Sequence, residues 1–269
     1  MFATEHTGAP GLARVAVSLR PPKGTMSAPS DALNPRSNRL LSALPDEEWA
    51  RWSGQLERVP LQLGQVLYES GRPQSHVYFP TTAIVSLLYV LEDGGSAEIA
   101  VVGYEGVVGV SLFMGGETTP SRAVVQSAGG CFRLSAATIK AEFNRYGVGM
   151  HLLLRYTQAL LTQMAQTAVC NRHHLLEQQL CRWLLLSLDR IAGDQLVMTQ
   201  ELIANMLGVR REGVTEAALK LQKLGLIEYA RGHITVIDRP GLEKRSCECY
   251  AVVSEEYDRL LNRPLPLAR

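Results

Sequence analysis

The 269-residue chain is predicted to be an α+β protein with an N-terminal antiparallel, jelly-roll-like β-roll, a long dimerisation helix and a C-terminal winged helix-turn-helix. Three features of the sequence predict this fold. Short apolar runs separated by glycines fill residues 56–134, and apolar residues then recur at helical intervals. The segment from Thr199 to Ala217 has the layout of two helices around a tight turn.

Composition limits the classes of protein that the chain can be. With 46% hydrophobic residues, 269 residues suffice for two modest domains. The net charge is +1, so binding to nucleic acid would rest on local charge. No apolar run reaches the roughly 20 residues that cross a bilayer, and the first 40 residues lack the apolar core of a secretion signal. The five cysteines are odd in number and widely spread, which predicts a reducing cytoplasm.

The order of the segments predicts where the domains lie. Residues 1–38 mix Pro, Gly, Ser and Ala without periodicity, which predicts a disordered tail, and Met26 could be the translation start. A short helix is expected over residues 40–54, with Pro45 in its first turn. The predicted units are then the β-roll at 39–148, the dimerisation helix and hinge at 149–172, the winged helix-turn-helix at 173–250, and a C-terminal helix and tail at 251–269.

The β-roll is predicted from short β-rich runs with glycine turns every 8–12 residues. Asp93-Gly94 is the strongest hairpin signal among these turns. The runs are residues 66–68, 76–79, 83–90, 97–102, 107–112, 123–126 and 131–134.

A heptad-like seam follows Ser135 and predicts the long helix. Its residues are Met150, Leu154, Thr157, Leu161, Met164 and Ala168. Further leucines beside the seam would let the helix face both its own β-roll and a partner chain, so a homodimer is the preferred interpretation. The alternative is a helix packed on its own domain alone. Residues 171–174 interrupt the apolar pattern and are interpreted as a hinge, and another amphipathic helix is expected over 175–191.

The helix-turn-helix is the most specific pattern in the chain. Thr199 is placed to cap a first helix with Ile203 and Leu207 on its buried face, and Gly208 stands at the sharp turn. Two β-like runs, residues 226–230 and 233–237, flank Arg231-Gly232 and predict a wing. A final helix is expected to start at Pro240 and to run through Tyr250 towards Leu261.

This order of elements resembles the Crp/Fnr family of bacterial transcription regulators over about residues 45–250. The most specific part is 199–226, where T-x-E-x-I-A-x-x-L-G-V-x-R-E-x-V precedes L-x-x-L-G-L-I. The resemblance implies a cytoplasmic homodimer that binds palindromic promoter sites in double-stranded DNA and responds to a small signal, with RNA polymerase as a protein partner. The alternative is a ligand-sensing dimer whose winged helix contacts protein instead of DNA.

The fold assigns Arg211 and Glu212 to the base edges, because Arg can bond guanine twice and Glu can accept from cytosine. Glu216 stands where the family often has another Arg, which predicts a different operator. The other predicted DNA contacts are Thr199, Gln200, Arg210, Thr215, Lys220, Arg231 and His233.

The family's effector pocket corresponds to residues 94–123, and its candidate residues here are Gly109, Ser111, Ser121 and Arg122. Val110 replaces the Glu that accepts from ribose in the nucleotide-binding members, and Ser121-Arg122 has the reverse order of their phosphate clamp. A cyclic nucleotide is therefore not the expected cofactor. The absence of any cysteine before Cys131 also disfavours an iron–sulfur cluster.

Other chemistry finds little support in the sequence. His173-His174 with Cys170 and Cys181 could form a metal or haem ligand set, but an ordinary polar hinge is the preferred interpretation. No metal is predicted, since Cys247 and Cys249 would point apart on a helix. Redox sensing by Cys170 or Cys181 stays open. No P-loop, G-x-S-x-G or H-E-x-x-H is present, and the acidic pairs 47–48 and 255–256 are interpreted as solvated charge, so no enzyme is expected.

Overall fold

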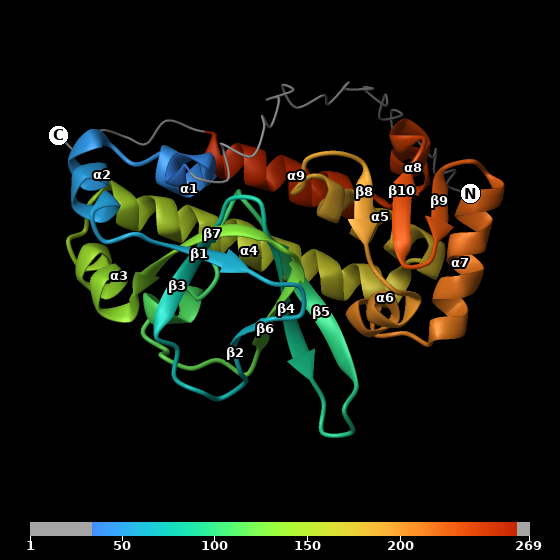
Figure 1. Cartoon of the computed structure of the whole chain (residues 1–269), viewed down its shortest axis with the longest axis horizontal. Coiled ribbons are helices and arrows are strands. Elements are labelled where there is room, and N and C mark those ends of the chain that lie inside the picture. Colours follow the sequence, from blue (N-terminus) through green and yellow to red (C-terminus); the bar gives the residue numbers. More distant parts are fainter. Residues whose placement is uncertain (1–33, 263–269) are drawn as a thin grey trace, which may run out of the picture.

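The computed structural model describes residues 34–262. They form a β-domain, a long helix that runs along it, and a mainly helical domain at the far end of that helix (Figure 1). Most of the predicted tail, residues 1–33, lies outside the described residues. None of the helices within the described part of the chain combines the length and apolar character needed to cross a membrane.

Two antiparallel sheets build the β-domain, in agreement with the predicted fold class. Their strands are short and consist mostly of buried and half-buried residues, and β4 is fully buried over its first five residues. The first sheet contains β1 (Glu57–Leu61), β7 (Gly129–Ser135) and β3 (His76–Pro80); the second contains β2 (Val66–Tyr68), β6 (Arg122–Ser127), β4 (Ile84–Val90) and β5 (Ser96–Val102).

The glycine turns explain most of the strand boundaries. Gly94 has φ of 86° and closes the β4–β5 hairpin, where Leu91 N donates to Gly95 O, so the predicted hairpin is confirmed. The expected strand at 107–112 is wrong: Val108 forms one bridge to Tyr78. Gly109, at φ of 102°, then turns the chain into a 3-10 helix, η3 (Val110–Leu112).

The predicted helix over residues 40–54 is two helices, α1 (Arg39–Ser42) and α2 (Asp46–Ser53), because Pro45 precedes the second as its N-cap. They are preceded by η2 (Pro35–Ser37). The buried Asn38 side chain donates to Pro80 O at 2.9 Å and to Gly106 O at 2.8 Å. The chain is therefore folded at residues 34–38, and the predicted disordered tail does not extend to residue 38.

The long helix α4 (Val148–His173) follows α3 (Ala136–Phe143) and begins at a carboxylate. The backbone N–H groups of Val148 and Gly149 donate to the Glu48 carboxylate at 2.8 and 2.6 Å. An anion at a helix N-terminus is stabilised by the helix dipole and the free N–H groups. The interpretation of Glu48 as solvated charge is therefore wrong: it joins α2 to α4.

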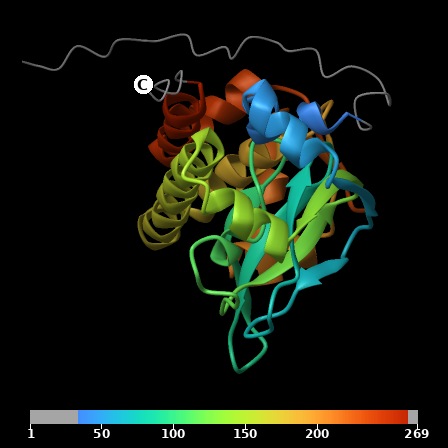
Figure 2. The ribbon, with the colours of Figure 1, turned by 90° about the vertical axis from the view of Figure 1, so that its left-hand side faces the viewer.

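The helix α9 (Glu248–Leu261) packs antiparallel beside α4, and together they cover one side of the β-domain (Figures 1 and 2). Val253, Tyr257, Leu260 and Leu261 of α9 belong to the same core as the strands. The predicted final helix from Pro240 is wrong in its extent, because Ser246 and Cys247 have extended backbone and separate α8 (Arg239–Arg245) from α9.

The predicted seam of α4 is partly buried within its own chain. Thr157 is buried, whereas Leu154 and Leu161 are 43% and 57% exposed. The helix also continues through the predicted hinge as far as His173. The break between helices is confined to His174 and Leu175, which are extended.

The C-terminal domain is built around a second core, to which Leu88 of β4 also belongs, and the order of its elements confirms the predicted winged helix-turn-helix architecture. The sequence missed β8, a three-residue strand that makes the wing a three-stranded sheet in the order β8-β10-β9. Its elements are α5 (Leu176–Leu188), β8 (Gln195–Val197), α6 (Gln200–Leu207), α7 (Arg211–Lys223), β9 (Ile227–Ala230), β10 (His233–Val236) and α8.

Candidate functional site

The two helices α6 and α7 meet as the sequence predicts. Thr199 is the N-cap of α6, and its hydroxyl accepts from Leu202 N at 3.2 Å. Gly208 follows α6 with φ of 66°, and Val214 at the start of α7 is fully buried. An L-residue at Gly208 would be strained and would bring its Cβ within 3.2 Å of Ala97 in β5.

The first turn of α7 presents its charged side chains to solvent. Arg210 is the N-cap residue, and Arg210, Arg211 and Glu212 are all exposed. The opposite side of this turn packs tightly, because a Cβ on Gly213 would lie 2.8 Å from the Leu176 side chain of α5. The helix is thus held against α5 while its N-terminal polar groups are left free.

A hollow lies between the start of α6, the start of α7 and the wing. Its lining residues are Thr199, Gln200, Arg211, Tyr229, Arg231 and Gly232. The Tyr229 hydroxyl donates to Met198 O at 2.9 Å, and Met198 N donates to Gly232 O at 2.6 Å. Partial burial raises the pKa of Tyr229, and the positive charge of Arg211 opposes that shift. These two hydrogen bonds therefore fix the wing to the residues just before α6.

Four other predicted DNA contacts lie outside this hollow; they are Thr215, Glu216, Lys220 and His233. The Thr215 hydroxyl lies 2.8 Å from Gln200 Oε1 and 3.0 Å from Arg211 O, so it holds α6 against α7. Glu216 forms an exposed ion pair with Lys220 at 3.2 Å. His233 is exposed at the start of β10, where it pairs with Ala230 and Val197.

The predicted effector residues surround one small hollow in the β-domain. Its volume is about 160 Å³ and it is lined by residues 67–69, 72–76 and 78. Ser111 Oγ donates to Gln74 Oε1 at 2.9 Å, and Gly109 lies against the same glutamine. Ser121 bonds to Tyr68, and Arg122 pairs with Glu69 at 3.1 Å. The four predicted effector residues therefore contact residues that line the hollow, but they do not line it themselves.

Two buried carboxylates join the β-domain to the helix-turn-helix domain, and sequence reasoning missed both. Glu98 in β5 accepts from Trp183 Nε1 of α5 at 3.0 Å. Glu105 accepts from Arg190 Nε at 2.7 Å, and both of these side chains are at least 93% buried. The sequence does not indicate that these two glutamates are buried, because each has its partner 85 positions away.

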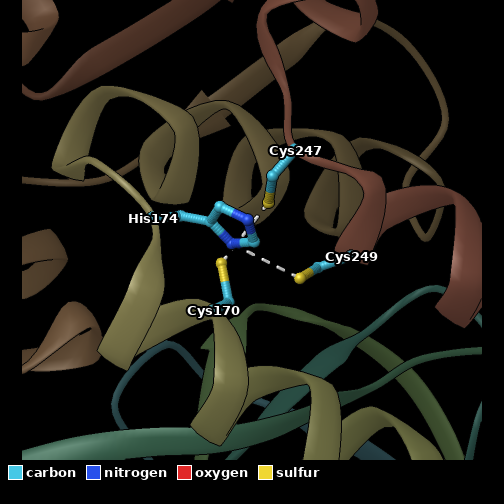
Figure 3. Close-up of side chains that lie close together, drawn as sticks. All are labelled: Cys170, His174, Cys247 and Cys249. Atoms are coloured by element: carbon cyan, nitrogen blue, oxygen red, sulfur yellow. Dashed lines mark hydrogen bonds between the residues drawn. The ribbon is translucent and has the colours of Figure 1, made fainter. Parts of the chain in front are cut away.

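The cysteines divide into two kinds. Cys131 and Cys181 are separate buried thiols, and burial raises the pKa of Cys181 to about 12, which favours its protonated form at neutral pH. Cys170, Cys247 and Cys249 instead gather with His174 at the junction of α4, α5 and α9 (Figure 3). His174 and Cys170 are candidates from the sequence, whereas the other two were excluded because Cys247 was expected inside a helix.

Two family models match the chain. The model of the cyclic nucleotide-binding domain matches residues 58–146, and the model of the Crp-like helix-turn-helix domain matches residues 178–245. A search of curated proteins finds no match.

Solved structures share this fold over almost their whole length and over about seven tenths of this chain. A Crp-family transcriptional regulator from Thermus thermophilus superposes with a TM-score of 0.59 at 19% identity, covering 71% of this chain and 96% of that chain. FixK2 from Bradyrhizobium japonicum gives 0.59 at 18%, covering 71% and 98%. CLP from Xanthomonas campestris, a c-di-GMP responsive global regulator, gives 0.57 at 16%, covering 72% and 100%.

The two matched family models agree with the structure, in which the first turn of α7 is exposed and the wing has three strands. A β-roll that matches the cyclic nucleotide-binding domain is followed in one chain by a Crp-like DNA-binding domain. The chain belongs to the Crp/Fnr family of transcriptional regulators.

Proposed function

We propose that the protein binds palindromic promoter sites as a homodimer and reads base edges with Arg211 and Glu212. The observation that carries this proposal is the exposed first turn of α7, which places both side chains at the end that enters the major groove in helix-turn-helix proteins. Arg211 supplies a bidentate donor for guanine, and Glu212 supplies an acceptor for cytosine.

The hollow beside this turn supports contacts with the DNA backbone. Gln200 and the α6 N-terminus line one side, and Arg231 lines the other. Free N–H groups at a helix start and a nearby guanidinium both suit phosphate oxygens. Glu216 reduces the local positive charge, and its pairing with Lys220 leaves Lys220 partly neutralised. We infer that phosphate contacts come chiefly from α6 and the wing.

The exposed stripe of α4 supports the homodimer. Leu154, Leu161 and Ala168 are exposed at heptad spacing. A helix that repeats apolar residues every seven positions buries them against a second helix. In the proposed dimer two such stripes pair, and two α7 helices face successive major grooves roughly 34 Å apart.

We infer that a signal acts near the hollow of the β-domain and that it is not a cyclic nucleotide. The hollow has a volume of about 160 Å³, which is below the range of about 300–1,000 Å³ typical of small-molecule sites. Arg122, the phosphate-clamp candidate from the sequence, is already paired with Glu69. Any such signal would reach α5 through the Glu98–Trp183 and Glu105–Arg190 contacts.

The decisive experiment is DNA binding by wild type and Arg211→Ala. Genome-wide mapping of bound DNA gives the operator, and fluorescence anisotropy at several salt concentrations then measures the affinities. We expect Arg211→Ala to lose about 5- to 150-fold in affinity for the operator, which corresponds to about 1–3 kcal/mol for one bidentate base contact. Weak, salt-sensitive binding to unrelated DNA should remain.

Arg259→Ala is the matched control, because it removes the same charge from the exposed side of α9. Equal operator binding by wild type and Arg211→Ala would contradict the assigned readout. No DNA binding by wild type at low salt would instead favour a winged helix that contacts protein.

A further inference from the structure

A buried cluster of three thiols and one imidazole lies away from both the DNA-binding face and the β-domain hollow. Cys170, Cys247 and Cys249 are 0%, 5% and 1% exposed, and they form a small core separate from the two domain cores. Their sulfur atoms and a ring nitrogen of His174 all lie within 4.8 Å of one another (Figure 3). Four potential ligand atoms thus converge on one point.

The distances fit a tetrahedral metal better than a disulfide. Cys170 Sγ and Cys247 Sγ are 3.5 Å apart, and Cys249 Sγ is 3.5 Å from His174 Nδ1. Atoms at the corners of a tetrahedron, about 2.0–2.3 Å from a central zinc, lie roughly 3.3–3.8 Å apart. A disulfide needs about 2.05 Å between the sulfurs. Two of the six distances between these atoms already match a zinc coordination shell, and the others are at most 4.8 Å.

The end of α4 and the start of α9 bring the ligands together. Cys170 lies in the last turn of α4, and His174, four residues later, is its C-cap, so both lie on one side of the helix end. Cys247 is the extended N-cap residue of α9, and Cys249 lies within its first turn. Because Cys247 is outside the helix, the expectation that it and Cys249 point apart is wrong. Cys-x-Cys can therefore supply two ligands here.

The orientation of the imidazole matches that of a metal ligand. While Nδ1 of His174 faces Cys249, Nε2 lies 3.3 Å from the Glu248 carboxylate. Histidines that bind metals commonly donate their second N–H to a carboxylate, which fixes the tautomer and the ring. The backbone oxygen of His174 also accepts from Gln179 Nε2 at 2.9 Å. The ring is thus held from outside with one nitrogen directed at the thiols.

A buried positive charge beside the cluster gives a second, independent indication. Arg182 of α5 is 3% exposed, its Nη1 donates to the Thr167 hydroxyl at 3.2 Å, and its Nε has no hydrogen-bond partner within the described residues. It lies close enough for its charge to act on Cys170 and Cys249. Three thiolates, a neutral imidazole and one Zn²⁺ have a net charge of −1. Such a centre would add a negative charge near Arg182, whose charge also acts on the buried Glu98 carboxyl.

We propose that Cys170, His174, Cys247 and Cys249 bind one Zn²⁺ ion in a closed Cys₃His site. Zinc is chosen because thiolate and imidazole in a tetrahedral set suit it, and because four protein ligands leave no open position for catalysis. On binding, the metal displaces the thiol protons to solvent and forms three Zn–S bonds without oxidation or reduction. The ion ties the α4–α5 junction to the start of α9 and fixes the helix-turn-helix domain relative to the dimer helix.

The test is metal analysis of the full chain expressed in zinc-containing medium and purified without chelator. We expect about one zinc per chain in wild type, in Cys131→Ser and in Cys181→Ser, the last two being matched controls with buried thiols elsewhere. Cys170→Ser and Cys249→Ser should retain less than about a fifth of it. Co²⁺ substituted for Zn²⁺ should give the absorption of a tetrahedral thiolate site.

Two further variants keep the test decisive if a serine variant fails to fold. Cys249→His restores a ligand and should recover zinc, and Glu248→Gln should weaken zinc affinity by about 10- to 100-fold with the ligands intact. Wild type without bound zinc, an iron–sulfur cluster, a Cys170–Cys247 disulfide, or zinc retained equally by Cys249→Ser would each overturn the proposal. These readouts are independent of DNA binding.

Discussion

Glu98 is a buried acid at the contact between β5 and α5. Burial raises its pKa to about 7, and hydrogen bonds from Ser86 and Trp183 and the charge of Arg182 only partly oppose that rise. In the unfolded chain the same carboxyl has an ordinary pKa near 4.5. The contact that joins the β-domain to the DNA-binding domain therefore includes a group that titrates near neutral pH.

We predict that Glu98 makes the protein less stable as the pH rises from about 4.5 to 7. In that range the unfolded carboxyl has lost its proton while the folded one retains it, so the folded state binds more protons and the unfolding free energy falls with pH. Above pH 7 the effect of Glu98 on the unfolding free energy no longer changes, and the total decrease in that free energy is about 3 kcal/mol.

Glu98→Gln should remove this pH dependence and be more stable than wild type at pH 8. Urea unfolding at pH 5 and pH 8 measures the difference for each protein, and Glu228→Gln, at an exposed position in β9, is the control. The same loss of stability between pH 5 and pH 8 in Glu98→Gln and wild type would contradict the prediction.

The sequence predicts residues well where a backbone requirement sets the residue type. Gly208 and Thr199 occupy the turn and the cap that the pattern predicts. Charged residues were less predictable. Glu48 and Glu105 have the same side chain as exposed glutamates, and only partners 85 to 101 positions away reveal that they are buried.

A buried ion pair joins the loop at residues 103–107 to the residues that follow α5. Arg190 Nε donates to Glu105 Oε1, and its Nη1 also donates to Leu186 O at 2.6 Å. Gly103 N donates to the same carboxylate at 3.2 Å. Removing one member of such a pair leaves the other charge buried and uncompensated.

Glu105→Ala should therefore lower the unfolding free energy by about 3–5 kcal/mol. Glu256→Ala is the control, because it breaks the ion pair with Arg259 near the surface, which should contribute less than about 1 kcal/mol. The measurement is urea unfolding followed by circular dichroism. If the two variants lost similar stability, the Glu105–Arg190 pair would not be an important link between the domains.

Long or strongly patterned elements were predicted, and short or unpatterned ones were not. The length of α4 and the two helices of the helix-turn-helix follow from their apolar spacing. The strands β1 and β8 were missed because Pro60 and a length of three residues hide a strand pattern. The Cys₃His cluster was missed because it joins residues 77 positions apart and depends on the helix break at Cys247.

The exposed stripe of α4 is the expected interface of the proposed homodimer. Leu161, at 57% exposure, lies near the middle of that helix. Leu161→Glu should convert the dimer to a monomer at micromolar concentration, because two facing carboxylates repel and the apolar contact is lost. Operator affinity should fall with it, because each monomer contacts one half-site.

Light scattering coupled to gel filtration measures the mass. Leu91→Glu is the matched control, because Leu91 is 64% exposed but follows β4 at the hairpin, away from α4. An unchanged dimer in Leu161→Glu would show that α4 does not form the proposed interface.

The packing of α9 against the β-domain has a consequence for how the chain is synthesised. The core beneath the strands includes Leu260 and Leu261, although the last strand of that domain ends at Ser135. At about 5–20 residues per second, a ribosome takes roughly 6–25 s to translate the intervening residues. During that interval the apolar side that α9 will cover is open to chaperones and to neighbouring nascent chains. The N-terminal domain of this regulator therefore completes its core only after the DNA-binding domain has been made.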